Sequence, residues 1–198
     1  GTIDAKVIPF TKESLNASQG LMDLETITGS RNRKAPIKDN IDPGGGIDFE
    51  LSDSAYSTLL KHLLGSVTTT GASDPYTHVI KIGNLPVGLV IEKGFTDLGQ
   101  YFKYNGCRIN KGTFKFPQSG KITGNFDIIG AKETIGAASM DSTPTSYTHI
   151  PFSAFQGTIQ EGGAAIATVT EAEVTIDNNL NKDGYTYGSG GERTQLSE

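Results

Sequence analysis

The sequence predicts a mainly β protein with a single α-helix. Apolar and polar residues alternate in short runs across residues 77–130, and turn-forming residues separate the runs, as in half-buried strands. The chain has 25 glycines, two methionines and no tryptophan, which favours a turn-rich β protein. Its 198 residues, 35% of them hydrophobic, are enough for one core, so we expect a single domain spanning residues 1–198.

The N-terminal part is expected to hold extended segments and one long loop. AKVIPF (residues 5–10) has an extended apolar pattern, and LMDLETITG (residues 21–29) favours a strand. GSRNRKAPIKDNIDPGGG (residues 29–46) has no apolar periodicity, two prolines and a glycine triplet. We expect a long loop there, either solvated or acting as an arm that orders against a neighbouring subunit.

The next stretch changes from a strand period to a helical period. Alternate residues are apolar at first: Ile47, Phe49 and Leu51. Apolar residues then recur at helical spacing: Tyr56, Leu59, Leu60, Leu63 and Leu64. We predict a helix at about 53–64, with Ser52 as N-cap and Gly65 as its C-terminal stop. A helix this short is only marginally stable on its own, and its leucine face must therefore pack on the sheet.

The central strands are predicted to have one apolar and one polar face. Across residues 121–128, one parity is apolar or glycine and the other is polar. Upstream, the apolar residues move from odd to even positions: Cys107 and Ile109, then Phe114 and Phe116. This change predicts a β-bulge near Lys111 and Gly112.

The C-terminal part is predicted to combine polar connectors with a hairpin. Residues 131–148 form a second long polar loop, and residues 150–180 favour a hairpin that turns at Gly162 and Gly163. Three carboxylates share one face of its second strand: Glu171, Glu173 and Asp177. With no histidine nearby, a water-facing or channel-facing surface is favoured over acid-base chemistry. Residues 181–198 form a polar segment, which loosely resembles residues 25–34 and is alternatively the start of a second repeat.

Catalytic and cofactor motifs are absent from the sequence. It has no phosphate-binding loop, dinucleotide fingerprint, nucleophile elbow or clustered Cys and His pairs. We therefore expect no enzyme activity, no cofactor and no metal. The single cysteine, Cys107, excludes an intrachain disulfide and is expected to be a buried thiol. His62 lies at the edge of the leucine face and is expected to be hydrogen-bonded or half-exposed.

Charge and hydropathy exclude further classes of function. The formal net charge of −5 opposes a general affinity for nucleic acid. No apolar run reaches membrane-spanning length and no signal peptide opens the chain, so we expect a soluble protein made in a cytosol.

Three stretches resemble the tail tube proteins of long-tailed (siphophage-type) bacteriophages. They are EKGFTDLGQYFKYNGCRINKGTFKF (residues 92–116), GKITGNFDIIGAKET (120–134) and AEVTIDNNL (172–180). The resemblance runs from about Ile47 to Glu198. It implies a β-sandwich or split-barrel fold with a flanking helix, shared with the ring protein of type VI secretion.

The resemblance also implies a structural virion protein of the phage tail, assembled in the bacterial host cytoplasm. Its partners would be copies of itself, forming stacked rings, and other tail proteins. DNA would be passing cargo without specific binding, and no membrane would be involved.

On this hypothesis two surfaces carry the function. The 29–46 loop would bridge rings through Arg31, Arg33, Lys34, Lys38 and Asp39. The lumen would be lined by Asp127, Glu171, Glu173 and Asp177, and a net negative lumen would repel the phosphates of DNA.

Two alternatives stay open at this point. One is a stand-alone carbohydrate-binding or adhesin-like module, for which we expect a cleft lined by Tyr101, Phe102 or Tyr104. The other is a type VI secretion-like ring protein, which would share the fold and the ring.

Overall fold

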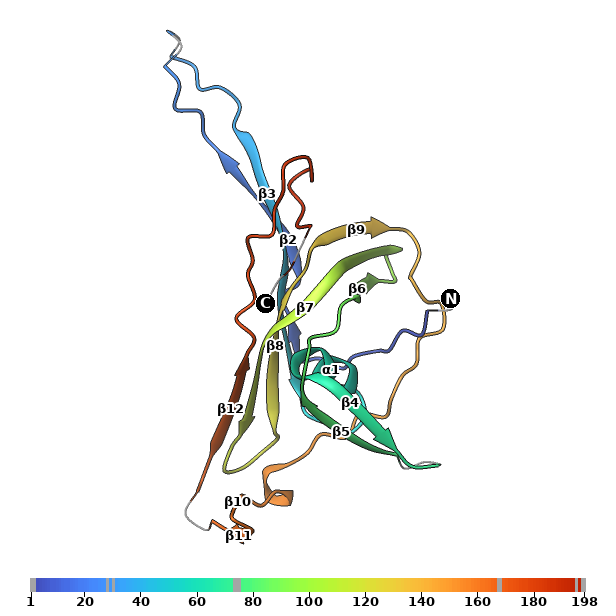
Figure 1. The fold of residues 1–198 in the computed structure, drawn as a ribbon. Helices are drawn as coiled ribbons and strands as arrows, with labels where there is room; N and C mark the ends of the chain where they lie inside the picture. Colours follow the sequence, from blue (N-terminus) through green and yellow to red (C-terminus); the bar gives the residue numbers. More distant parts are fainter. Residues whose placement is uncertain are drawn as a thin grey trace.

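The computed structural model describes residues 3–27, 29, 31–72, 76–166, 169–194 and 196, and this part of the chain is mainly β (Figure 1). The strands are β1 (Lys12–Glu13), β2 (Asn16–Met22), β3 (Ile37–Glu50), β4 (Gly65–Thr70), β5 (Thr77–Ile82), β6 (Leu89–Phe95), β7 (Gln100–Phe116), β8 (Thr123–Ile129), β9 (Lys132–Gly136), β10 (Gln160–Glu161), β11 (Ala164–Ala165) and β12 (Ala172–Asp177). The described part also contains one α-helix, α1 (Ser57–Leu64), and one 3₁₀ helix, η1 (Ala154–Gln156). The predicted mainly β class is confirmed.

β7 organises a curled sheet because its two halves pair with different strands. Its first half pairs with β6 and β9, and its second half pairs with β8 and β12. β8 pairs in turn with β3, to which β1 and β2 are also paired. We call β1, β2, β3, β8, the second half of β7 and β12 the main sheet. All its pairings are antiparallel, in the order β1-β3-β8-β7-β12 with β2 also on β3.

The predicted bulge in β7 is confirmed. The register between β7 and β8 shifts at Asn110, between Ile109 and Lys111. Asn110 also holds the chain that follows β12: its Oδ1 accepts a hydrogen bond from the Leu180 N–H at 3.0 Å, and its carbonyl accepts one from Asn178 at 2.8 Å. The bulge therefore keeps apolar residues on one face of β7 despite their change of parity.

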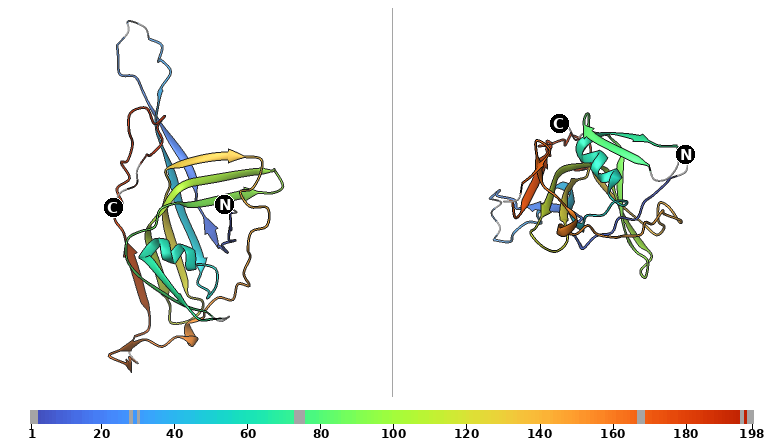
Figure 2. Two further views of the ribbon diagram at one scale, coloured as in Figure 1. Left: turned by 45° about the vertical axis from the view of Figure 1, so that its right-hand side comes forward. Right: turned by 90° about the horizontal axis from the view of Figure 1, so that it is seen from below.

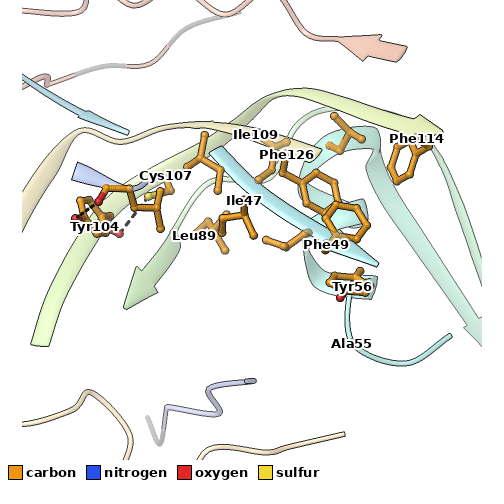
Figure 3. Packing of buried hydrophobic residues seen from close by; sticks show 14 residues of the cluster. Ile47, Phe49, Ala55, Tyr56, Leu89, Tyr104, Cys107, Ile109, Phe114 and Phe126 are labelled. Atoms are coloured by element: carbon orange, nitrogen blue, oxygen red, sulfur yellow. Dashed lines mark hydrogen bonds between the residues drawn. The ribbon is translucent and has the colours of Figure 1, made fainter. Parts of the chain in front are cut away.

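An aromatic cluster fills the space between the main sheet and α1 (Figure 3). Phe49 stacks on Phe126 with ring centroids 4.7 Å apart, and Phe114 meets both rings edge-on. Tyr56 lies against Phe49, and its hydroxyl donates a hydrogen bond to the Pro9 carbonyl at 2.9 Å. Burial raises the pKa of Tyr56 to about 12, so this hydroxyl stays protonated and can donate at neutral pH.

Two glycines allow close packing on the apolar face of the main sheet. A side chain at Gly112 would collide with Leu63 of α1, and one at Gly124 would collide with the ring of Phe49. The leucine face of α1 therefore lies directly on β7, as predicted. α1 and the β4–β5 hairpin that follows it occupy this side of the sheet (Figure 2).

The helix begins about four residues later than the sequence predicts. It begins at Ser57, after bends at 53–56, and its N-cap position, Tyr56, makes no side-chain capping bond. The predicted cap, Ser52, is buried instead, with its Oγ 3.2 Å from His149 Nδ1. A contact distant in sequence has thus replaced the local cap. Gly65 ends the helix as predicted, with φ of 112°.

Three predicted boundaries are wrong because pairing between distant segments decides them. Residues 37–46 of the predicted loop belong to β3, and residues 132–136 of the second predicted loop form β9 on β7. The predicted strand at 21–29 ends with β2 at Met22. Thr28 and Ser30 lie outside the described residues, as do residues 195, 197 and 198 of the predicted C-terminal segment.

The C-terminal hairpin is shorter than predicted. The turn at Gly162 and Gly163 is confirmed, but β10 and β11 pair over only two residues each. The long strand that was expected to complete this hairpin is β12, which pairs with β7 instead.

Candidate functional site

A two-stranded ribbon projects from one end of the main sheet (Figure 1). We call residues 19–41 the arm; it consists of the ends of β2 and β3 with the turn region between them. Every described residue from 18 to 40 is exposed, so neither face of the arm is covered by the rest of the chain. Apolar side chains are nevertheless frequent on it: Leu21, Met22, Leu24, Ile27 and Ile37.

The five predicted arm residues all lie on this ribbon. Arg31, Arg33 and Lys34 lie in the turn region, and Lys38 and Asp39 lie at the start of β3. The Arg33 guanidinium forms an exposed ion pair with Asp23 at 3.1 Å.

The base of the arm is clamped by the C-terminal segment. The Arg193 side chain is only 2% exposed, and its guanidinium pairs with the Asp42 carboxylate. It also donates hydrogen bonds to the carbonyls of Lys182 at 2.7 Å and Gly130 at 2.9 Å. The ring of Tyr185 stacks on the guanidinium, 5.0 Å away. One buried cation therefore joins β3, the end of β8 and the C-terminal segment.

The opposite face of the main sheet from α1 is polar. Asp127 and Asp177 each lie directly opposite Lys111 on a neighbouring strand, and Glu173 lies directly opposite Lys115. Direct cross-strand partners share a face, so three of the four predicted lumen residues lie together. Glu171 immediately precedes β12 and is exposed.

This polar face carries both signs of charge, whereas the sequence pattern predicted only its carboxylates. Its acidic residues are Asp48, Glu50, Asp127, Glu173 and Asp177, and its basic residues are Lys12, Lys111, Lys115 and Lys121. Five acidic and four basic side chains leave a net charge of −1. The face is therefore hydrophilic and nearly balanced, rather than strongly acidic as the four carboxylates alone predicted.

Both borders of the main sheet are open in the described part of the chain. β12 pairs with β7 on one side, and it ends the strand order. At the other border, β1 and β2 pair only with β3. Val174, on the apolar side of β12, is 47% exposed. Exposed borders of this kind are ready to pair with another chain.

Comparison with protein families matches the whole chain, residues 1–198, to the family described as phage tail tube protein. The chain belongs to the phage tail tube protein family. No curated protein matches it significantly. Membership supports a structural role as a virion component of the tail, assembled with copies of itself and with other tail components.

The tail tube protein also has a cleft, but its lining does not fit the binding-module alternative. The cleft has a volume of about 760 Å³ and lies between the N-terminal segment, α1 and β6. Its wall is mainly apolar, and Tyr101, Phe102 and Tyr104 do not line it. Tyr104 is buried, and its hydroxyl donates to the Leu15 carbonyl at 3.1 Å.

The chemically reactive residues of this tail tube protein are placed as structural groups. Cys107 is buried as predicted, and burial raises the pKa of its thiol to about 12. His62 is half-buried in the cleft wall, and burial lowers its pKa. The described residues contain no cluster of His, Cys, Asp or Glu that could hold a metal ion. None of the helices in the described part is long and apolar enough to span a membrane.

Proposed function

We propose that this tail tube protein assembles into stacked rings that form a hollow tube through which DNA passes. The observation that carries the proposal is the main sheet. In the described part of the chain, α1 packs on its apolar face, the C-terminal segment covers the opposite polar face only beside Ile129, and its two borders are unpaired. In a ring, β12 of one copy would pair with the β1 and β2 border of the next, so that main sheets join into a continuous barrel. Family membership supports this arrangement.

The polar face is the side we assign to the lumen. α1 packs on the other face, with the β4–β5 hairpin against α1, and that side would lie outside. A nearly balanced face with a small acidic excess offers no continuous track of cations to bind phosphates, so DNA would pass without being retained. Mixed charges also keep the wall hydrated.

The arm would connect successive rings, since it projects beyond one end of the main sheet (Figures 1 and 2). The contact between rings would involve the charged side chains of the arm: Arg31, Arg33, Lys34, Lys38 and Asp39. Raising salt should weaken this contact by screening. Tubes that are indifferent both to salt and to charge reversal at these positions would contradict the role of the charges.

The experiment that tests the proposal is negative-stain microscopy of the purified protein over a range of concentrations, combined with sedimentation velocity. We expect rings and hollow tubes in equilibrium with a small species. A species that stays monomeric at every concentration, with and without the other tail components, would contradict the proposal.

A further inference from the structure

Two exposed apolar surfaces lie at opposite ends of the molecule. One is the arm, and the other is the segment 150–166, which we call the basal segment (Figures 1 and 2). The basal segment contains η1, β10 and β11. Its exposed apolar side chains are Ile150, Phe152, Phe155 and Ile159.

The first part of the basal segment, residues 152–154, is held firmly by its neighbours. Backbone hydrogen bonds attach it to the ends of β3 and β8: Phe152 donates to the Leu51 carbonyl at 2.8 Å, and Ile122 donates to the Phe152 carbonyl at 3.0 Å. Ala154 donates to Gly120 at 2.9 Å. Although its backbone is held on both sides, Phe155 remains 88% exposed. A large aromatic side chain presented to water by a fixed backbone is typical of a contact surface.

The arm presents a matching apolar set, and beyond its clamped base its side chains are exposed. Ile27 is 96% exposed, and Leu21 and Leu24 are also exposed on the ribbon. A two-stranded ribbon is marginally stable alone, so a partner that covers these residues would stabilise it. The arm and the basal segment lie too far apart on one copy to cover each other (Figure 1).

The two surfaces differ in charge. The arm has four basic and three acidic residues, a net charge of +1. The basal segment has one acidic residue, Glu161, and no lysine or arginine, a net charge of −1. Glu171, which follows the segment and precedes β12, is also exposed. A like pair of arms or of basal segments would repel, whereas an arm and a basal segment attract.

We propose that the arm of one copy seats on the basal segment of a second copy, with Ile27 and its apolar neighbours against Phe155. The inference rests on the proposed function and names the surface that binds the arm, which we call its seat. Because the two surfaces differ, the contact is head-to-tail, and because they lie at opposite ends of the molecule it produces an open stack of copies. The arm of the next copy in the stack covers the basal segment of each copy.

Engineered cysteines test the contact directly, because the native Cys107 is buried and does not compete. The variant Ile27→Cys with Phe155→Cys should form disulfides between copies, giving a ladder of covalent oligomers in sedimented tubes without reductant. Ile27→Cys with Ile82→Cys is the matched control. Ile82 is also 88% exposed but lies beside α1, at neither end, and should give no ladder.

A charge exchange supplies a second test. Arg31→Glu with Lys34→Glu should raise the protein concentration for half-maximal tube formation by about tenfold. Adding Glu161→Lys and Glu171→Lys to the same chain should return this concentration most of the way to its original value, since the charges of the two surfaces are again opposite in sign. Lys81→Glu, on β5, should have little effect.

The outcomes separate the seat from the proposed function. Tubes without a ladder in the Ile27 and Phe155 variant, and without rescue by the charge exchange, would overturn the seat and leave the tube intact. Absence of rings and tubes in the unmodified protein, with and without the other tail components, would contradict the proposed function itself, and the contact of the arm with it.

Discussion

The aromatic core beneath α1 and the projecting arm use apolar residues in opposite ways. Phe126 is fully buried among Phe49 and Phe114 of the same chain, whereas Ile27 on the arm is almost fully exposed. The same type of side chain therefore stabilises the fold in one region and is left for a partner in the other. Substitutions in the two regions should consequently separate folding from assembly.

The largest expected effect on folding is at the core. Phe126→Ala should lower the free energy of unfolding by about 3–5 kcal/mol, because it removes a buried ring and leaves a cavity. Urea unfolding of the monomer at low concentration measures it. Ile27→Ala is the paired comparison and should change monomer stability by less than about 0.5 kcal/mol. Equal losses in both variants would remove the distinction between the two regions.

The clamp at the base of the arm should give the next largest effect. Arg193→Ala removes a buried guanidinium and leaves the carbonyls of Gly130 and Lys182 without this donor, at a cost of about 2–4 kcal/mol. Hydrogen exchange should show faster exchange at the start of β3 than in the aromatic core. Arg193→Lys should recover only part of the loss, since one ammonium cannot reproduce the planar fork. Uniform acceleration of exchange across the sheet would contradict a local clamp.

Substitution at the open border should affect assembly more than folding. Val174→Lys places a charge on a half-exposed site of β12, so the monomer should lose no more than about 1 kcal/mol, while ring formation should be lost. Ile135→Lys is the matched control, because Ile135 is also exposed on a border strand, β9, outside the main sheet. Sedimentation velocity compares the two; rings that form normally with Val174→Lys would exclude β12 as the joining border.

The smallest expected effect is the pH dependence from His62. Burial, with further contributions from Lys61 and Arg108, lowers its pKa below the ordinary value of 6.5. Protonation is then disfavoured in the folded state, so this contribution is present above pH 6.5 and is lost as pH falls through the folded pKa. Unfolding free energies measured at about pH 7.5 and about pH 5 should differ less in His62→Gln than in the unmodified protein. An unchanged difference would mean that His62 does not contribute.

Local patterns predicted the parts of the fold that depend on neighbouring residues. The change of parity between Ile109 and Phe114 located the bulge, and the spacing of Leu59 and Leu63 located the helix that packs on Gly112. The resemblance of a few stretches was enough to predict the family that the whole chain matches.

Features that depend on distant pairing could not be predicted in this way. Residues 37–42 contain no clear alternation, and they form a strand because β2 pairs with them. Lys111 and Lys115 join the carboxylates on the polar face only through the register of β7 with β8 and β12. Arg193 stands in a polar segment without a pattern, and its role depends on Asp42, 151 positions away.

The central claim is that the polar face of the main sheet lines a lumen, and labelling of Thr175→Cys tests it most directly. Thr175 lies on that face, exposed and opposite Thr113. In assembled tubes, a small maleimide should react with the new thiol while a bulky polyethylene glycol maleimide should not; Ile82→Cys, on the α1 side, should react with both. Equal reaction of Thr175→Cys with the bulky reagent in tubes and in free subunits would contradict the account.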